Sequence, residues 1–208
     1  MDEPAQRTAL LSALTTEHFV LQTATSTTYT EASARSSLYV MALSSSLVAM
    51  GFLSNSPDAL MPFTATVLPA LFLLGLFTVA RLVETGLESM HYLVGIARIR
   101  GFYRTLGPDA EHYFASEHGR WPEVKSPALR LGPVLAFLGT TASMIAVVNN
   151  AVAGAGIALM VHSASPSAPR WMVVALGVAS ALSLTGAFYA YQRWRFAEFD
   201  AVSPISDD

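Results

Sequence analysis

The sequence contains no cysteine, and only 13% of its residues are charged. The absence of cysteine excludes disulfides, thiolate metal sites and cysteine nucleophiles. The charged fraction is about half of that in an ordinary soluble domain, whereas 52% of the residues are hydrophobic. The formal net charge of −3 argues against a general nucleic-acid binder, so we expect no nucleic-acid partner.

The scarcity of charge leaves four long uncharged stretches. Residues 36–57, 59–80 and 171–192 contain no charged side chain, and residues 131–169 contain His162 as their single ionisable group. A membrane-spanning helix needs roughly 20 apolar residues, so each of the first three stretches fits one span. The fourth is long for one span and too short for two spans with a turn. The sequence therefore predicts an all-α, polytopic membrane protein with four transmembrane helices in a lipid bilayer.

The first two spans, expected at about residues 36–54 and 62–81, are predicted to continue as helices beyond the membrane. Residues 7–53 contain no proline, and residues 62–104 keep helical spacing after their apolar half. Each helix would be about 65–70 Å long at 1.5 Å per residue. The connector between them, SNSPDALM, is short and rich in helix breakers. We predict an antiparallel hairpin, with facing residue numbers that sum to about 115 and a cytosolic extension.

This hairpin and its extension occupy residues 1–105 in the predicted organisation. A cytosolic connector at 106–130, a second membrane hairpin at 131–192 and a cytosolic tail at 193–208 follow. Within the second hairpin, span three is expected to begin at Gly132, and span four to run from Trp171 to Gln192.

The Lys and Arg residues predict the orientation of the spans. All of them except Arg170 fall on the side of the connector and the two termini. Cytoplasmic segments carry an excess of Lys and Arg, so we expect both termini to be cytoplasmic and the protein to lie in a cell inner (plasma) membrane. The start of the chain, MDEPAQRTALLSALTTEHF, is acidic and too polar for a cleaved signal peptide. The first span is therefore expected to act as its own insertion signal.

Four charged residues gather at one height in the predicted register: Glu31 lies level with Glu84, and Arg35 lies level with Arg81. Glu31 and Arg35 also form an i,i+4 pair in its favourable orientation. We interpret the four as an interfacial charge clasp that fixes the depth and register of the hairpin; the alternative is a gate or ion-relay cluster. Pro69 removes one backbone hydrogen bond and is expected to bend span two, either as a packing kink or as a moving hinge.

Asn149 and Asn150 lie near the middle of span three, where an unpaired amide is costly. Asn150 belongs to a stripe of small residues at four-residue spacing: Ala142, Ala146, Asn150, Gly154 and Ala158. Span four offers a similar stripe: Ala175, Ala179, Ser183 and Ala187. We predict that spans three and four pack along these stripes and that Asn150 forms an interhelical hydrogen bond. The alternative, a pore-lining or ligand-contacting amide, applies mainly to Asn149.

No pattern in the sequence predicts a metal site or an active site. Glu88 and His91 form half of a di-iron E-x-x-H ligand set, but the predicted register places only threonine and alanine opposite them. The Glu-His pairs at 111–112 and 117–118 are interpreted as solvated surface charge. Serine-elbow, zincin, P-loop and dinucleotide-binding motifs are all absent. We therefore expect no enzyme activity, no cofactor and no metal.

Two stretches carry a resemblance to known proteins, TEHFVLQTATSTTYTEASARSSLYV at residues 16–40 and ARLVETGLESMHYLVGIARIRGFY at residues 80–103. Both resemble uncharacterised four-span integral membrane proteins of high-GC bacteria. The resemblance implies a bacterial membrane protein with four spans, and it implies no established activity.

The function that this pattern favours is a subunit of an oligomeric channel or pore-forming assembly, because rigid helical stalks and mid-membrane amides suit subunits arranged around an axis. The alternative is a membrane scaffold or accessory subunit that binds a cytosolic protein partner through the stalk. A sensor or transporter is less favoured, because neither internal repeats nor discontinuous spans are evident. A membrane enzyme is disfavoured because the sequence has no catalytic constellation.

Overall fold

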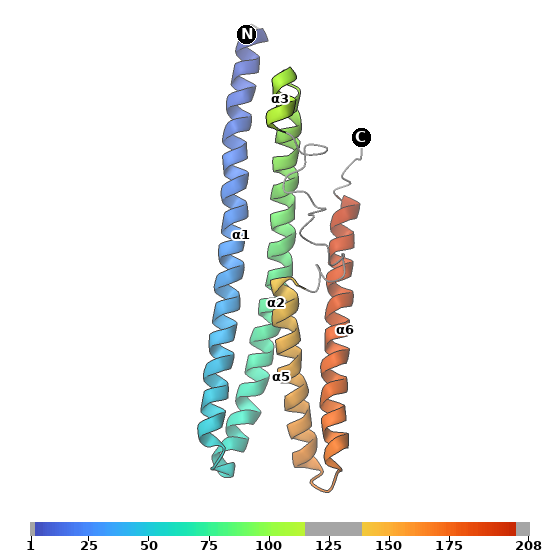
Figure 1. Ribbon diagram of the computed structural model, residues 1–208. Helices are drawn as coiled ribbons and strands as arrows, with labels where there is room; N and C mark the ends of the chain where they lie inside the picture. Colours follow the sequence, from blue (N-terminus) through green and yellow to red (C-terminus); the bar gives the residue numbers. More distant parts are fainter. Residues whose placement is uncertain (1–2, 115–138, 203–208) are drawn as a thin grey trace. The chain divides into compact units, whose positions relative to one another are not determined.

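The computed structural model describes residues 3–114 and 139–202, and every regular element in these ranges is a helix (Figure 1). The first range contains α1 (Glu3–Leu53), α2 (Pro57–Arg104) and the short α3 (Pro108–Tyr113). The second contains α5 (Thr141–Ala164) and α6 (Arg170–Val202). The predicted all-α fold class is confirmed for the described residues.

Four of these helices, α1, α2, α5 and α6, are long and apolar enough to cross a membrane. This number agrees with the four uncharged stretches of the sequence. Their length and composition support a membrane protein that crosses the bilayer several times.

The second helix begins earlier than the sequence predicted. α2 starts at Pro57 rather than at Pro62, and only residues 54–56 separate it from α1. Proline is accepted in the first turn of a helix, where no backbone N–H is needed. Residues 57–61 of the predicted connector therefore belong to the start of α2, and residues 54–56 form the turn. The helix continues through Pro62 and Pro69.

α5 starts at Thr141, where the hydroxyl of Thr140 caps the helix by accepting a hydrogen bond from the backbone N–H of Ser143 at 3.3 Å. The predicted start of span three at Gly132 lies outside the described residues. The predicted connector at 106–130 lies outside the described residues from residue 115 onward, and so does the Glu-His pair at 117–118. The last residues of the predicted tail, 203–208, also lie outside them.

The chain divides into two compact units, which are described separately. Unit 1 comprises residues 1–32 and 84–135, and unit 2 comprises residues 33–83 and 136–208. α1 and α2 each contribute one part to unit 1 and the other part to unit 2. In α1 and α2 the division falls close to the ends of the predicted spans, at about residues 36 and 81.

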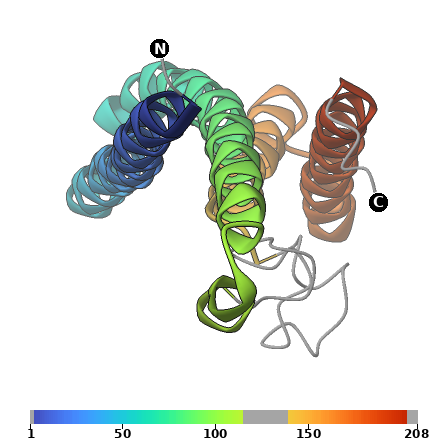
Figure 2. The ribbon, with the colours of Figure 1, turned by 90° about the horizontal axis from the view of Figure 1, so that it is seen from above.

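In unit 2, α5 lies between α2 and α6 (Figures 1 and 2). The buried core draws on all four helices of the unit, because Tyr39 of α1, Leu71 of α2, Ala146 of α5 and Phe188 of α6 are each at most 9% exposed. The short turn from Ser165 to Pro169 joins α5 to α6.

The outer surface of unit 2 carries many large hydrophobic side chains. Large hydrophobic side chains are exposed on each of its helices, among them Val48, Phe77, Met144 and Leu182. A soluble monomer rarely exposes contiguous apolar surface of this extent. Contact with lipid chains accounts for it, which agrees with the four candidate spans.

In unit 1, the first part of α1 packs against the last part of α2. Leu21 lies against Gly95, where an added Cβ would come within 2.9 Å of the leucine side chain. Six residues earlier along α1, the hydroxyl of Thr15 lies 3.4 Å from the hydroxyl of Tyr103. Both contacts lie within one helical turn of the predicted register. The buried interface of unit 1 combines Ile96 of α2 with small hydroxyl side chains.

Candidate functional site

Asn149 of α5 is hydrogen-bonded to two other helices of unit 2. Its amide nitrogen donates a hydrogen bond to the carbonyl oxygen of Phe72 on α2 at 3.3 Å. Its amide oxygen accepts a hydrogen bond from the hydroxyl of Tyr39 on α1 at 3.2 Å. Asn149 is 2% exposed and Tyr39 is 1% exposed. We call the side chains of Asn149 and Tyr39, with the carbonyl of Phe72, the Asn149 node; it joins three helices in the buried interior.

Gly75 of α2 makes the space that the Asn149 node occupies. A Cβ atom added at Gly75 would overlap the amide of Asn149 and would lie 2.8 Å from the ring of Tyr39. The helix can pass this close to the amide only because the residue has no side chain. The sequence analysis did not single out Gly75 or Tyr39. The signal available for Tyr39 was the single tyrosine of the first predicted span, since buried tyrosine hydroxyls usually find a partner.

The amide of Asn150 is bonded to α6, whereas that of Asn149 is bonded to α1 and α2. The Asn150 amide nitrogen donates to the hydroxyl of Thr185 on α6 at 3.1 Å, and that hydroxyl donates to the carbonyl of Ala181 at 2.8 Å. The interhelical hydrogen bond predicted for Asn150 is therefore present. The two adjacent amides face different helices, so α5 is held to α2 by one and to α6 by the other.

The stripe predicted on α5 is where α5 meets α6, but the stripe predicted on α6 is wrong. Gly154 and Gly177 face each other so closely that a Cβ on Gly154 would overlap the carbonyl of Gly177. The contact on α6 continues through Ala181 to Thr185. The predicted residues are instead all exposed: Ala175, Ala179, Ser183 and Ala187. The face of α6 that contains Gly177 packs against α5 because Gly177 allows a close backbone approach and Thr185 offers the Asn150 amide a partner.

A third polar group lies at the start of α5 and was missed by the sequence analysis. The hydroxyl of Ser143 donates to Gln192 of α6 at 3.3 Å and lies 2.8 Å from the hydroxyl of Thr140. The Gln192 amide nitrogen lies 3.4 Å from the Thr140 hydroxyl. Ser143 and Gln192 are 0% and 1% exposed. We call these three residues the Gln192 cluster; a glutamine ending an uncharged run was the signal for it.

The residues of the predicted charge clasp fall next to the division between the two units. Glu31 and Glu84 belong to unit 1, whereas Arg35 and Arg81 belong to unit 2. Arg35 is exposed and the other three are partly buried. Each of the four has an interaction partner, and their role as a clasp stays a prediction. Pro69 lies within the uninterrupted α2, and its role as a hinge also stays a prediction.

The described residues hold no group of three or more histidine and acidic side chains placed to bind a metal ion. In the E-x-x-H pair, Nδ1 of His91 lies 2.9 Å from the carbonyl oxygen of Leu87, within its own helix. The buried amides of Asn149, Asn150 and Gln192 in unit 2 instead bond to groups on other helices.

Four apolar helices, held together by buried amide and hydroxyl groups, define the chain as a helical membrane protein of the multi-pass class. No protein-family model, curated protein or solved structure matches the chain. Its function is therefore argued from its own geometry.

Proposed function

We propose that the protein is a subunit of an oligomeric membrane channel or pore-forming assembly, in which copies associate along one face of α1. The observation that carries the proposal is a run of exposed, uncharged residues at alternating steps of four and three. We call it the α1 stripe: Ala9, Ala13, Thr16, Val20, Thr23, Thr27, Thr30, Ala34, Ser37, Met41, Ser44, Val48 and Gly51. A repeat of 3.5 residues is the spacing along which helices pack as left-handed coiled coils.

The α1 stripe suits close helix packing because its residues are small or satisfy their own polar groups. The hydroxyls of Thr16, Thr23, Thr27 and Thr30 each donate to the carbonyl four residues earlier at 2.9–3.1 Å. These groups therefore need no water as a partner. Small residues let helix backbones approach each other closely in membranes.

Among the four candidate spans, the one formed by α1 has the smallest share of buried residues. In its most apolar stretch only 6% of the residues of α1 are buried, against 28% for α2 and for α5. Ser37 and Ser44 of the α1 stripe are exposed in this region. Exposed serines on a spanning helix favour contact with another subunit or with an aqueous path over contact with lipid.

The buried amides favour α1 over α5 as the lining of a pore. Asn149, the residue that the sequence made the pore candidate, has both ends of its amide bonded inside unit 2. Asn150 is bonded to Thr185. We therefore assign both amides to packing within one subunit. In the proposal, the part of the α1 stripe that contains Ser37 and Ser44 lines the pore.

The proposal places the protein in a bacterial inner membrane with both termini in the cytoplasm, which the distribution of Lys and Arg supports. In this orientation unit 1 is a cytosolic antiparallel hairpin. A single cysteine at Ser126 should then resist an impermeant thiol reagent added to intact cells. Labelling from outside would reverse the topology.

A scaffold or accessory subunit is the second candidate, and exposed aromatic side chains in unit 1 favour it. Phe19 is 62% exposed and Tyr29 is 61% exposed. Aromatic residues are enriched where proteins meet partners. In this role unit 1 would bind a cytosolic protein while the spans anchor it.

The experiment that decides between the two measures subunit number in detergent and ion flux from liposomes that hold the purified protein. The channel predicts a closed oligomer and measurable flux. Ser44→Phe should disrupt assembly or block conduction by a hydrophobic constriction. Ser45→Phe is the matched control, because Ser45 is also exposed but lies off the stripe. A monomer without flux would remove the channel and leave the scaffold.

A further inference from the structure

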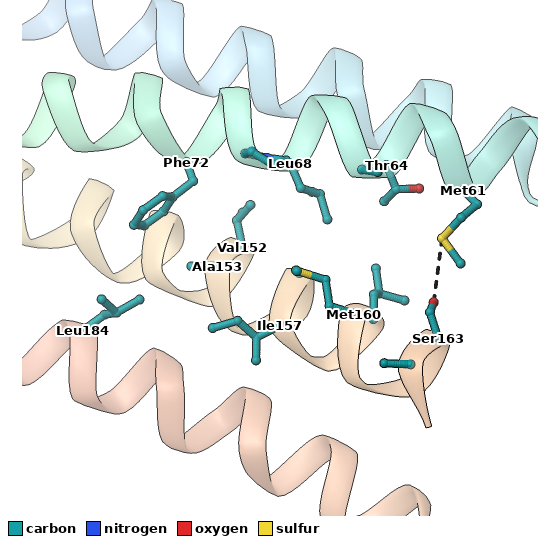
Figure 3. A pocket seen from close by; sticks show the side chains of 15 residues that line it. Met61, Thr64, Leu68, Phe72, Val152, Ala153, Ile157, Met160, Ser163 and Leu184 are labelled. Carbon is teal, nitrogen blue, oxygen red and sulfur yellow. Dashed lines mark hydrogen bonds between the residues drawn. The ribbon is translucent and has the colours of Figure 1, made fainter. Parts of the chain in front are cut away.

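A pocket of about 820 Å³ lies between α2 and α5 in unit 2 (Figure 3). Its volume is in the range of pockets that bind small molecules, roughly 300–1,000 Å³. Two polar contacts between helices reach its edge, one through the backbone carbonyl of Phe72 and one between Ser163 and Met61. The side chains that shape it include Met61, Leu68 and Phe72 of α2, Ile157 and Met160 of α5, and Leu184 of α6.

The pocket exists because α5 approaches its two neighbours to different degrees. Toward α6, the backbones are so close that a Cβ on Gly154 would overlap a carbonyl. Toward α2, a Cβ on Gly156 would lie 3.6 Å from Leu68, which is an ordinary contact distance. Small residues lie where these two helices face each other, including Ala65 of α2 and Ala153 of α5. They leave the space between the helices unfilled.

The lining is uncharged, and both of its hydroxyl groups are already bonded. The hydroxyl of Thr64 donates to the carbonyl of Leu60, and the hydroxyl of Ser163 donates to the sulfur of Met61 at 3.8 Å. An ordered water needs two to four polar partners, which this lining does not supply. An empty space of this size forfeits dispersion contacts, so the stable content of the pocket is an apolar chain or ring.

The position of the pocket along the helices favours an extended hydrocarbon chain over a ring as its ligand. Met61 and Ser163 lie near the turns that end the two helix pairs, whereas Phe72 lies at the Asn149 node. From Met61 to Phe72 the rise is about 16 Å at 1.5 Å per residue, roughly half of a 30 Å hydrocarbon core. The pocket thus extends over the depth of one leaflet. Met61 and Met160 are 53% and 72% exposed, and flexible methionines adapt to irregular apolar ligands.

We infer that this pocket binds one acyl chain of a membrane phospholipid. The chain lies along α2 and α5, with the head group at the Met61–Ser163 end and the methyl end near Phe72. The inference is independent of the proposed channel, because all lining residues belong to unit 2 of a single chain.

Native mass spectrometry of the full chain tests this assignment. The purified protein is incubated with vesicles of palmitoyl-oleoyl phosphatidylglycerol, transferred to dodecyl maltoside and sprayed. Ala153→Trp fills the pocket, whereas Ala151→Trp adds the same side chain at an exposed position of α5 outside the lining. We expect one retained phospholipid per chain for the wild type and for Ala151→Trp, and at least tenfold lower retention for Ala153→Trp.

Several results would overturn the inference. These are equal retention by all three proteins, no retention by the wild type, the mass of a free fatty acid in place of the phospholipid, and a loss of oligomer mass specific to Ala153→Trp. The last result would mean that a second copy covers the pocket. Circular dichroism verifies that each variant is folded. Gly156→Leu serves as a second filling variant, because a Cβ at that position meets no close contact.

Discussion

Replacing Asn149 by alanine should destabilise the protein more than replacing Asn150. Asn149→Ala removes the hydrogen bond to the Phe72 carbonyl and the one from Tyr39. It also leaves the Tyr39 hydroxyl buried without its partner. Asn150→Ala removes a single bond, and the hydroxyl of Thr185 keeps its bond to the carbonyl of Ala181.

The expected losses follow from these contacts. A net hydrogen bond contributes about 1 kcal/mol, and bonds between membrane helices average about 0.6 kcal/mol. A buried hydroxyl left unpaired costs a further ~1–3 kcal/mol. We therefore expect Asn149→Ala to lower the free energy of unfolding by about 2–4 kcal/mol and Asn150→Ala by about 1 kcal/mol. From the small-residue stripe alone, Asn150→Ala would be the more destabilising of the two substitutions; the observed contacts reverse that order.

Unfolding in mixed detergent micelles with increasing dodecyl sulfate, followed by far-ultraviolet circular dichroism, measures both losses. Tyr39→Phe completes a double-mutant cycle, because it removes the hydroxyl and keeps the ring. The cycle should show a coupling free energy of about 1 kcal/mol between Tyr39 and Asn149. Additive losses, or an Asn149→Ala protein no less stable than Asn150→Ala, would refute the node as described.

Four further substitutions, one of them a control, test the packing of unit 2 in the same unfolding assay. Gly75→Ala should cost roughly 1–3 kcal/mol, because its Cβ overlaps the Asn149 node. Gly177→Val should cost at least as much, because its Cβ would lie 2.7 Å from a backbone oxygen of α5; Ala179→Val, on the exposed face, should change stability by less than about 0.5 kcal/mol. Gln192→Leu should cost about 1–2 kcal/mol, because it removes the hydrogen bonds that the buried Gln192 amide makes with the hydroxyls of Ser143 and Thr140. Equal effects of the two valine substitutions would contradict the close contact between Gly177 of α6 and Gly154 of α5.

The spacing of charges and small residues was enough to predict the four apolar helices and the face of α5 that meets α6. It was not enough to choose the matching face of α6. Two sets of small residues lie on α6, one through Ala179 and one through Gly177, and helical spacing does not distinguish them. The choice depends on how closely two backbones approach and on where Asn150 finds a hydroxyl, and both are properties of the packed pair.

The partners of Asn149 were beyond sequence reasoning for a similar reason. Tyr39 and Phe72 lie far from Asn149 along the chain and on two different helices. One of the partners is a backbone carbonyl, which leaves no trace in the residue types. The cap of α5 at Thr140 was also beyond sequence reasoning, because the uncharged run continues upstream of it and hydropathy does not mark where helical hydrogen bonding begins.

The association of copies along α1 is tested most directly by single-cysteine crosslinking in membranes. The chain has no native cysteine, so one cysteine at a time can be placed on the α1 stripe, at Thr27, Met41 or Val48, or off it, at Leu38 or Val40. All five positions are exposed. Copies inserted in the same orientation bring equal stripe positions together. The proposal predicts disulfide-linked dimers at the three stripe positions and few at the other two. Equal crosslinking at all five positions, or none at the stripe, would contradict it.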